Sequence, residues 1–231
     1  MIYIPVAAGA AFLLAFLVKC KDKRSVGGVF LKNTVSIFFI LTAALGLYVN
    51  PDSLKYALPI ICGLVFGMLG DIYLDQKWVY PDDMKKYLYA GFISFGIGHL
   101  FYIPAMVRAA GLDLKLLFIP AAAGVVVGVG NLLLEKPMKQ NFGEYKVIVT
   151  IYGFILAFMA ATAVVCAVVT GKTTFILFAA GGVFFLLSDL ILSPMYFGEG
   201  KNTPLNFVLN HVTYYLGQYL IALSVYFFSA S

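Results

Sequence analysis

The sequence predicts an all-α fold: a polytopic membrane bundle of about eight transmembrane helices forming one domain over residues 1–231. The first reason is composition, because 62% of the 231 residues are hydrophobic and only 12% are charged, whereas about a quarter of a typical soluble domain is charged. The second is length, since apolar runs of about 20 residues recur along the chain, enough for a helix to cross the bilayer. The third is that the runs are continuous and do not alternate, which favours helices over barrel strands.

Connections rich in proline, glycine and charge separate the predicted spans, as expected of helix ends at a membrane interface. The first span has no basic segment before it, so we expect it to be a transmembrane helix and not a cleaved signal peptide. The predicted spans cover residues 2–18, 31–49, 56–74, 87–107, 114–134, 145–169, 173–193 and 204–228.

Basic residues predict the orientation, because 12 of the 16 Lys and Arg residues flank one side of the spans. The positive-inside tendency places that side in the cytoplasm, most simply of a bacterial cell. We therefore relate the net charge of +5 to loops beside anionic lipid, and expect no nucleic-acid partner. The 12 residues are Lys19, Lys21, Lys23, Arg24, Lys32, Lys77, Lys85, Lys86, Lys136, Lys139, Lys146 and Lys201, and the other four are Lys55, Arg108, Lys115 and Lys172.

The chain contains an internal similarity. The segment VFGMLGDIYL at 65–74 and the segment VFFLLSDLIL at 183–192 share five of ten residues at a shift of 118. In the following spans, GHLFYI at 98–103 resembles GQYLIA at 217–222 at a shift of 119. This pattern predicts a duplication into halves 1–112 and 113–231, each with four spans in the same orientation.

Each copy of the first repeated segment contains an aspartate, Asp71 and Asp189. A charged side chain at membrane depth costs at least a few kcal/mol, so an ionisable residue there is a candidate for function. We expect Asp189 to lie deeper than Asp71, and both to reach one cavity that opens to the cytoplasm.

Further polar side chains are expected in the same half of the membrane or at its middle. His99 and Gln218 fall near the middle of their spans, Ser188 precedes Asp189, and Lys32 begins the second span. His211 lies close to the start of the last span. Tyrosine hydroxyls are expected at similar depths, from Tyr73, Tyr102, Tyr152, Tyr214 and Tyr215. The three cysteines, Cys20, Cys62 and Cys166, lack metal-ligand spacing, and we predict neither a metal nor a cofactor.

Four motifs in order, FGMLGDIYL, SFGIGHLFYI, FLLSDLIL and TYYLGQYLIA, resemble those of the YhhN-type lysoplasmalogenase family. The resemblance extends over essentially the whole chain. It implies hydrolysis of the vinyl ether bond of lysoplasmalogens to a fatty aldehyde and a glycerophospho-alcohol, with Asp71 and Asp189 as the key carboxylates. It also implies a role for a lysine at the start of the second span, usually beside proline, whereas this chain has Lys32-Asn33.

The residues fit this chemistry. A vinyl ether is hydrolysed by protonation of its β-carbon, which forms an oxocarbenium ion that water attacks. Two carboxylates can divide the work of proton donor and water-orienting base, as in glycosidases. We predict Asp189 as the acid and Asp71 as the base, although the roles could be reversed.

The remaining candidates would hold the lysophospholipid substrate. We expect His99, Tyr102 and Gln218 to hydrogen-bond the aspartates or the ether oxygen, with Ser188 and Tyr214 nearby. Lys32 or loop lysines would hold the lipid phosphate. The long hydrocarbon chain would lie among the apolar side chains of the spans, within the bilayer.

Two alternatives stay open. A metal-dependent membrane hydrolase could use Asp71, Asp189, His99 and His211, although the chain has only two histidines and catalytic zinc usually has three protein ligands. A transporter or lipid-binding protein would also suit parallel repeats with intramembrane acids. The sequence indicates neither the headgroup preference nor the oligomeric state.

Overall fold

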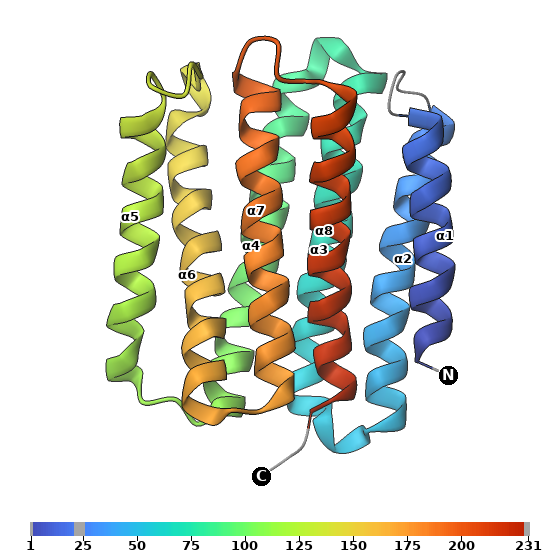
Figure 1. Ribbon diagram of the computed structural model, residues 1–231, viewed down its shortest axis with the longest axis vertical. Helices are drawn as coiled ribbons and strands as arrows, with labels where there is room; N and C mark the ends of the chain where they lie inside the picture. Colours follow the sequence, from blue (N-terminus) through green and yellow to red (C-terminus); the bar gives the residue numbers. More distant parts are fainter. Residues whose placement is uncertain (1, 21–25, 229–231) are drawn as a thin grey trace. The chain divides into compact units, whose positions relative to one another are not determined.

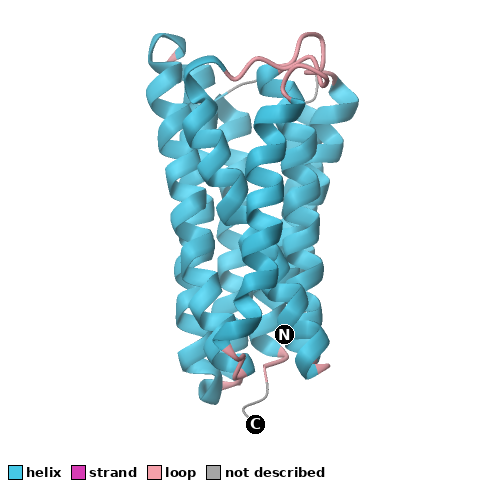
Figure 2. Cartoon of the chain, turned by 90° about the vertical axis from the view of Figure 1, so that its left-hand side faces the viewer, coloured by secondary structure: helices cyan, strands magenta, loops and turns pink. Residues whose placement is uncertain are grey.

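The computed structural model describes residues 2–20 and 26–228. Three of the basic residues used above, Lys21, Lys23 and Arg24, lie outside the described residues. The described part of the chain forms helices with no strand, apart from an isolated bridge between Gln140 and Gly198 (Figure 2). This confirms the predicted all-α fold.

Within these ranges the chain forms eight α-helices of 17 to 27 residues. They are α1 (Tyr3–Cys20), α2 (Val26–Val49), α3 (Leu54–Val79), α4 (Met84–Ala110), α5 (Phe118–Leu134), α6 (Lys146–Thr170), α7 (Thr173–Phe197) and α8 (Pro204–Tyr226).

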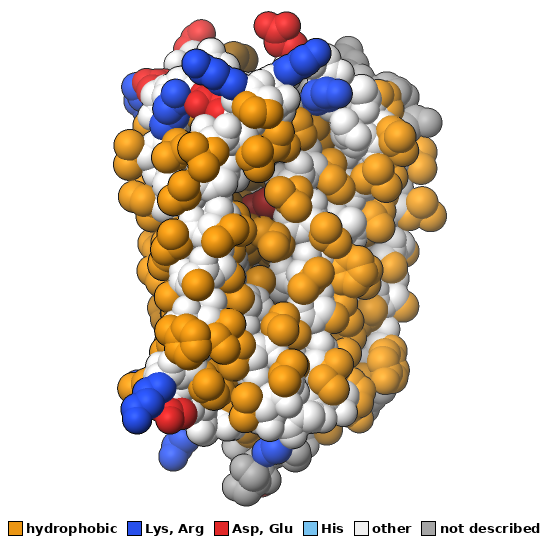
Figure 3. Space-filling view, turned by 60° about the vertical axis from the view of Figure 1, so that its left-hand side comes forward, with side chains coloured by type: hydrophobic (Ala, Val, Ile, Leu, Met, Phe, Trp, Pro, Cys, Tyr) orange, Lys and Arg blue, Asp and Glu red, His pale blue; other side chains and the backbone are white. Residues whose placement is uncertain are grey.

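Seven of the described helices, α1 to α7, are long and apolar enough to cross a membrane. Helix α8 has a sufficient length of 23 residues, but its polar residues, including Asn206, Asn210, His211 and Gln218, lower its hydropathy. On the face shown in Figure 3, apolar side chains cover the middle of the helices and charged side chains gather at their ends. The protein is therefore an integral membrane protein.

Short connections join successive helices. Single 3-10 turns that begin with a proline, Pro51–Ser53 and Pro81–Asp83, lead into α3 and α4, because proline fixes φ at a helical value and its missing N–H is not needed at a helix start. Gly171 ends α6 in the left-handed conformation, with φ of 64°, which glycine adopts at little steric cost. Tight connections of this kind keep consecutive helices antiparallel.

The helices fall into two compact units. Unit 1 comprises Met1–Ala105 and Ala222–Ser231, and unit 2 comprises Met106–Ile221. In unit 1, α1 packs against α2 and α2 against α3. In unit 2, α5 packs against α6 and α6 against α7, and Figure 1 shows these three helices side by side.

A pair of glycines brings the last two helices of each unit together. In unit 1, a Cβ atom on Gly98 of α4 would lie 2.8 Å from the carbonyl oxygen of Gly63 of α3. In unit 2, a Cβ atom on Gly217 of α8 would lie 2.8 Å from the carbonyl oxygen of Gly181 of α7. The residue numbers of these two contacts differ by 118 and 119, the same shifts that relate the repeated segments.

A second contact between α3 and α4 also has a counterpart between α7 and α8. In unit 1, a Cβ atom on Gly91 would lie 3.6 Å from the carbonyl oxygen of Gly70. At the corresponding positions of unit 2, Asn210 Nδ2 donates a hydrogen bond of 2.9 Å to the carbonyl oxygen of Ser188. Equivalent residues thus meet in the two helix pairs, which supports our proposal that the chain arose by duplication.

Gly217→Ala should lower stability, because its Cβ would press on the backbone of α7, which cannot move aside as a flexible side chain could. We expect a loss of about 1–3 kcal/mol, as for other overpacked helix contacts. Thermal unfolding in detergent measures it. Gly130→Ala in α5 is the matched control, since nothing lies within 4 Å of a Cβ there, and it should leave stability unchanged or raise it. Equal melting temperatures for the two variants would contradict this close approach.

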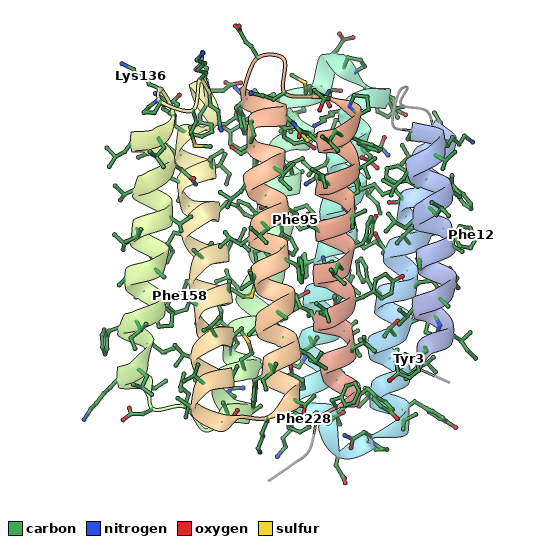
Figure 4. All side chains as sticks on the ribbon, in the orientation of Figure 1. Tyr3, Phe12, Phe95, Lys136, Phe158 and Phe228 are labelled. Atoms are coloured by element: carbon green, nitrogen blue, oxygen red, sulfur yellow. The ribbon has the colours of Figure 1, made fainter. Side chains whose placement is uncertain are left out.

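Glu135 organises the connection between α5 and α6 in unit 2, where Figure 4 labels the neighbouring Lys136. Its carboxylate accepts a hydrogen bond of 2.8 Å from the Phe142 backbone N–H and pairs with Lys146 Nζ at 3.0 Å. The same connection is tied to the end of α7, because Ser193 Oγ donates to Gln140 Oε1 at 2.7 Å. These contacts hold the end of α7, the helix that contains Asp189.

The pKa of Glu135 lies below its ordinary value of 4.5. The main cause is the hydrogen bond that its carboxylate accepts from the Phe142 N–H, and the second is its hydrogen bond with Lys146. Because the pKa of Glu135 is lower in the folded state, its ionised carboxylate stabilises the protein at pH values above about 4.5. This contribution is lost as the pH falls from about 4.5 through the folded-state pKa. We therefore expect Glu135→Gln to melt below the wild type at about pH 7, with a difference that shrinks below about pH 4.5. Glu144→Gln, which removes an exposed carboxylate from the same connection, is the control. A difference that does not vary with pH would contradict this role of the ionised carboxylate.

Candidate active site

The two aspartates occupy equivalent positions in their helices. Asp71 lies eight residues before Val79, the last residue of α3, and Asp189 lies eight residues before Phe197, the last residue of α7. At about 1.5 Å per residue, each is about 12 Å from its helix end. The expectation that Asp189 is the deeper residue is therefore wrong when depth is counted along the helix, because α3 continues beyond its predicted end at residue 74.

In unit 1, Asp71 belongs to a buried charged cluster. Lys32 Nζ of α2 lies 3.3 Å from Asp71 Oδ1 and 3.0 Å from Asp75 Oδ1. Ser36 Oγ donates a hydrogen bond of 2.8 Å to Asp71 Oδ2. Lys32 and Asp71 are only 5% and 2% exposed, so this pair is shielded from solvent. Residues four apart share one face of a helix, which explains how Lys32 and Ser36 face Asp71 and Asp75.

The position of Lys32 bears on its predicted role. The side chain is directed at two carboxylates, and moving it to a lipid phosphate would leave both without this cation. A buried charge that loses its partner is strongly destabilising. Phosphate binding by Lys32 stays a prediction, and the geometry favours a role in holding Asp71 in its ionised form.

His99 and Tyr102 belong to α4 of unit 1 and lie away from the level of Asp71. Both are 1% exposed, and their ring centroids are 6.1 Å apart. Gly98, next to His99, meets Gly63, which is eight residues from Asp71. His99 and Tyr102 are therefore about two helical turns, or about 12 Å along α3, from the level of Asp71.

In unit 2, Asp189 is surrounded differently. Tyr152 OH of α6 donates a hydrogen bond of 2.5 Å to Asp189 Oδ2, and Ser188 Oγ lies 3.4 Å from Asp189 Oδ1. Ser188 also donates to the Phe185 carbonyl oxygen at 2.8 Å. Tyr152 is buried, whereas Asp189 is partly exposed. Within the described residues, the partners of Asp189 are thus neutral hydroxyl groups.

Helix α8 lines α7 with a row of polar residues spaced four apart, Asn210, Tyr214 and Gln218. Asn210 bonds to the Ser188 carbonyl oxygen, as described above, and the Tyr214 ring packs edge-on against Phe185 at 5.3 Å. Gln218 Nε2 donates a hydrogen bond of 3.0 Å to Tyr214 OH. This row runs along α7 away from Asp189.

The two halves differ in the charge of the side chains at the positions around the aspartate. At the shift of 118 residues, Lys32 corresponds to Thr150 and Asp75 corresponds to Ser193. Thr150 bonds to its own helix, at the Lys146 carbonyl oxygen, and Ser193 bonds to Gln140. Two carboxylates at equivalent positions are thus placed in a charged and a neutral environment.

Sequence reasoning missed several polar contacts of this site. Asp75 and Ser36 could have been found from their spacing of four residues from Asp71 and Lys32. Asn210 lies in a segment whose sequence suggested only the end of a helix at the membrane interface. Tyr152 was one of several tyrosines, and nothing in its sequence context indicated that it bonds to Asp189.

The residues of the metal-dependent alternative do not form a cluster. Over the part of the chain that the structure describes, no three His, Cys, Asp or Glu side chains lie close enough to hold a metal ion. His211 instead contacts its own helix, with Nδ1 at 2.8 Å from the Phe207 carbonyl oxygen and its ring 4.2 Å from the Phe207 ring.

These features define a class: an α-helical integral membrane protein with intramembrane carboxylates held by a lysine in one unit and by hydroxyl groups in the other. The chain belongs to the YhhN family, whose model matches residues 28–225. It matches no curated protein and no solved structure. Family membership suggests a membrane hydrolase of the lysoplasmalogenase type.

Proposed function

We propose that this protein hydrolyses the vinyl ether bond of lysoplasmalogen-type lysophospholipids, releasing a fatty aldehyde and a glycerophospho-alcohol. Membership of the YhhN family supports the reaction class. The observation that carries the mechanism is the unequal surroundings of Asp71 and Asp189, because acid and base catalysis by two like residues requires environments that differ.

Asp189 is the proposed proton donor. Its partners among the described residues are the hydroxyl groups of Tyr152 and Ser188, so no adjacent cation favours loss of its proton. Tyr152 fixes the orientation of the carboxyl group. Transfer of the Asp189 proton to the β-carbon of the vinyl ether leaves a positive charge shared between the neighbouring carbon and the ether oxygen.

Asp71 is the proposed base. Lys32 at 3.3 Å and the Ser36 hydroxyl at 2.8 Å stabilise its carboxylate form. A carboxylate can orient the attacking water and accept its proton. The water oxygen bonds to the positively charged carbon, and the resulting hemiacetal breaks its bond to the glycerol oxygen. The carbonyl group of the aldehyde forms, the glycerol oxygen takes a proton, and one water is consumed.

The bilayer supplies the surroundings of the substrate. Apolar side chains are exposed along the helices of both units, among them Leu14, Val126 and Val168, and the hydrocarbon chain of the substrate is proposed to lie among side chains of this kind. The excess of basic residues on one side of the spans supports the placement of that side in the cytoplasm, and the site is proposed to open there, in a bacterial membrane. His99, Tyr102, Ser188, Tyr214 and Gln218 are proposed to contribute to the polar part of the substrate site.

A product assay in heavy water tests the proposal. Purified protein in detergent should release fatty aldehyde from a lysoplasmalogen, and the aldehyde should contain one deuterium on the carbon next to its carbonyl group, because that carbon receives the solvent-derived proton. Saturated ether lysolipids should give no product. Release of aldehyde without deuterium would contradict protonation of the β-carbon.

Two control measurements separate the alternatives. Activity that a chelator removes and zinc restores would indicate the metal-dependent hydrolase. Uptake of lysolipid into proteoliposomes, with no chemical change, would indicate a transporter.

A further inference from the structure

Gln218 of α8 has a buried carbonyl group that the proposed proton transfers do not use. The side chain is 1% exposed, and its amide nitrogen donates to Tyr214 OH at 3.0 Å. Its Oε1 atom has no hydrogen-bond partner among the described residues. A buried acceptor without a donor is unfavourable and rare in native proteins, so this atom points to a donor that is supplied from outside the chain.

The position of Gln218 relates it to Asp189 within unit 2. Gly217, its neighbour, meets Gly181, which is eight residues before Asp189, and Gln218 is one residue further away, so Gln218 and Asp189 are about 13 Å apart along the helix axes. Helices α7 and α8 are antiparallel (Figure 1). Because side chains lean towards the N-terminus of their own helix, the side chains of Asp189 and Gln218 lean towards each other and shorten this separation.

The proposed substrate has a donor at a matching distance from the reacting carbon. In a lysoplasmalogen, five bonds separate the β-carbon of the vinyl ether from the oxygen of the free sn-2 hydroxyl, which is about 6 Å when extended. With a hydrogen bond of about 3 Å at each end, the molecule can reach from a proton donor on α7 to an acceptor two turns away on α8.

We infer that Gln218 Oε1 accepts a hydrogen bond from the free sn-2 hydroxyl of the lysolipid, an inference that rests on the proposed function. Gln218 then determines specificity for the lyso form. A diradyl plasmalogen has an ester at sn-2 and no hydroxyl there, so it would leave the buried carbonyl group without a donor. Sites built to hydrogen-bond a hydroxyl group discriminate strongly against analogues that lack it.

Binding of two saturated ether lysolipids tests this inference. One has the sn-2 hydroxyl and the other is its 2-deoxy analogue, and isothermal titration of the full chain in detergent gives the Kd of each. We expect the wild type to bind the hydroxyl compound at least about 10-fold more tightly. Gln218→Met, which keeps the length of the side chain without the carbonyl group, should bind both within about 2-fold.

Two further variants guard against a folding defect. Gln218→Glu keeps an acceptor and should retain the preference for the hydroxyl compound. Thr213→Ala, on the same helix, removes a hydroxyl group that donates to the Leu209 and Asn210 carbonyl oxygens, and should also retain it. An equal preference in the wild type and Gln218→Met, or no preference in the wild type, would overturn the inference.

These outcomes are distinguishable from failure of the proposed function. Neither test compound contains a vinyl ether, so their binding does not depend on hydrolysis. Absence of aldehyde release from a lysoplasmalogen would contradict the proposed reaction, whereas the Kd ratio by itself decides the role of Gln218.

Discussion

Asp189→Asn is expected to lower kcat for aldehyde release by about 1,000-fold, within the range known for loss of a general acid. Asparagine has nearly the same shape and can still accept the hydrogen bond from Tyr152 OH, so the contact between α6 and α7 should persist. It cannot give a proton to the β-carbon. Mass spectrometry of the released aldehyde, with purified variant and wild type at equal concentration, measures the effect.

Asp82→Asn is the matched control for Asp189→Asn. Asp82 is exposed in the connection between α3 and α4, and its replacement makes the same side-chain change outside the α-helices. It should retain wild-type activity. Full activity of Asp189→Asn, with an unchanged melting temperature, would eliminate Asp189 as the proton donor.

Lys32→Met should cause the largest loss of stability, about 3–5 kcal/mol, because it removes the cation from two carboxylates at once. The side chains of Lys32, Asp71 and Asp75 are 6%, 3% and 15% exposed, so water can do little to replace the ammonium group. Unfolding in mixed micelles with increasing SDS measures the free energy of unfolding.

Single replacements of the carboxylates give the contrast. Asp75→Asn leaves Lys32 and Asp71 as an ion pair with no net charge, and should therefore lower stability much less than Lys32→Met. Asp71→Asn leaves the Lys32–Asp75 pair, so it should remain folded while losing aldehyde release. Equal destabilisation by Lys32→Met and Asp75→Asn would show that the ion pairs do not explain the stability of this cluster.

The duplicated pattern allowed much of the architecture to be predicted. Helical spans follow from apolar length, because a segment in lipid must satisfy its own backbone hydrogen bonds. The similarity of 65–74 to 183–192 also marked Asp71 and Asp189 as corresponding residues, and the contacts Gly63–Gly98 and Gly181–Gly217 occur at the same shifts. The local sequence was sufficient for the spans and for this correspondence, whereas the glycine contacts were found only in the structure.

The partners of the aspartates could not be predicted in the same way. A lysine at the start of a span has the composition of an interface anchor, and only the packing of α2 against α3 turns Lys32 towards Asp71 and Asp75. Tyr152 and Asp189 are 37 residues apart, and their contact depends on the rotation of α6 and α7 about their axes. Such rotations are set by side-chain packing between helices, which no single segment encodes.

The amino-acid sequence by itself therefore determined the membrane class of this protein, its helices and the two intramembrane acids, because each depends on properties of short segments. The tertiary structure alone decided which acid is paired with a lysine and which with a tyrosine. Electrostatic interactions depend on separations of a few ångströms between side chains, and those separations exist only after the helices have packed.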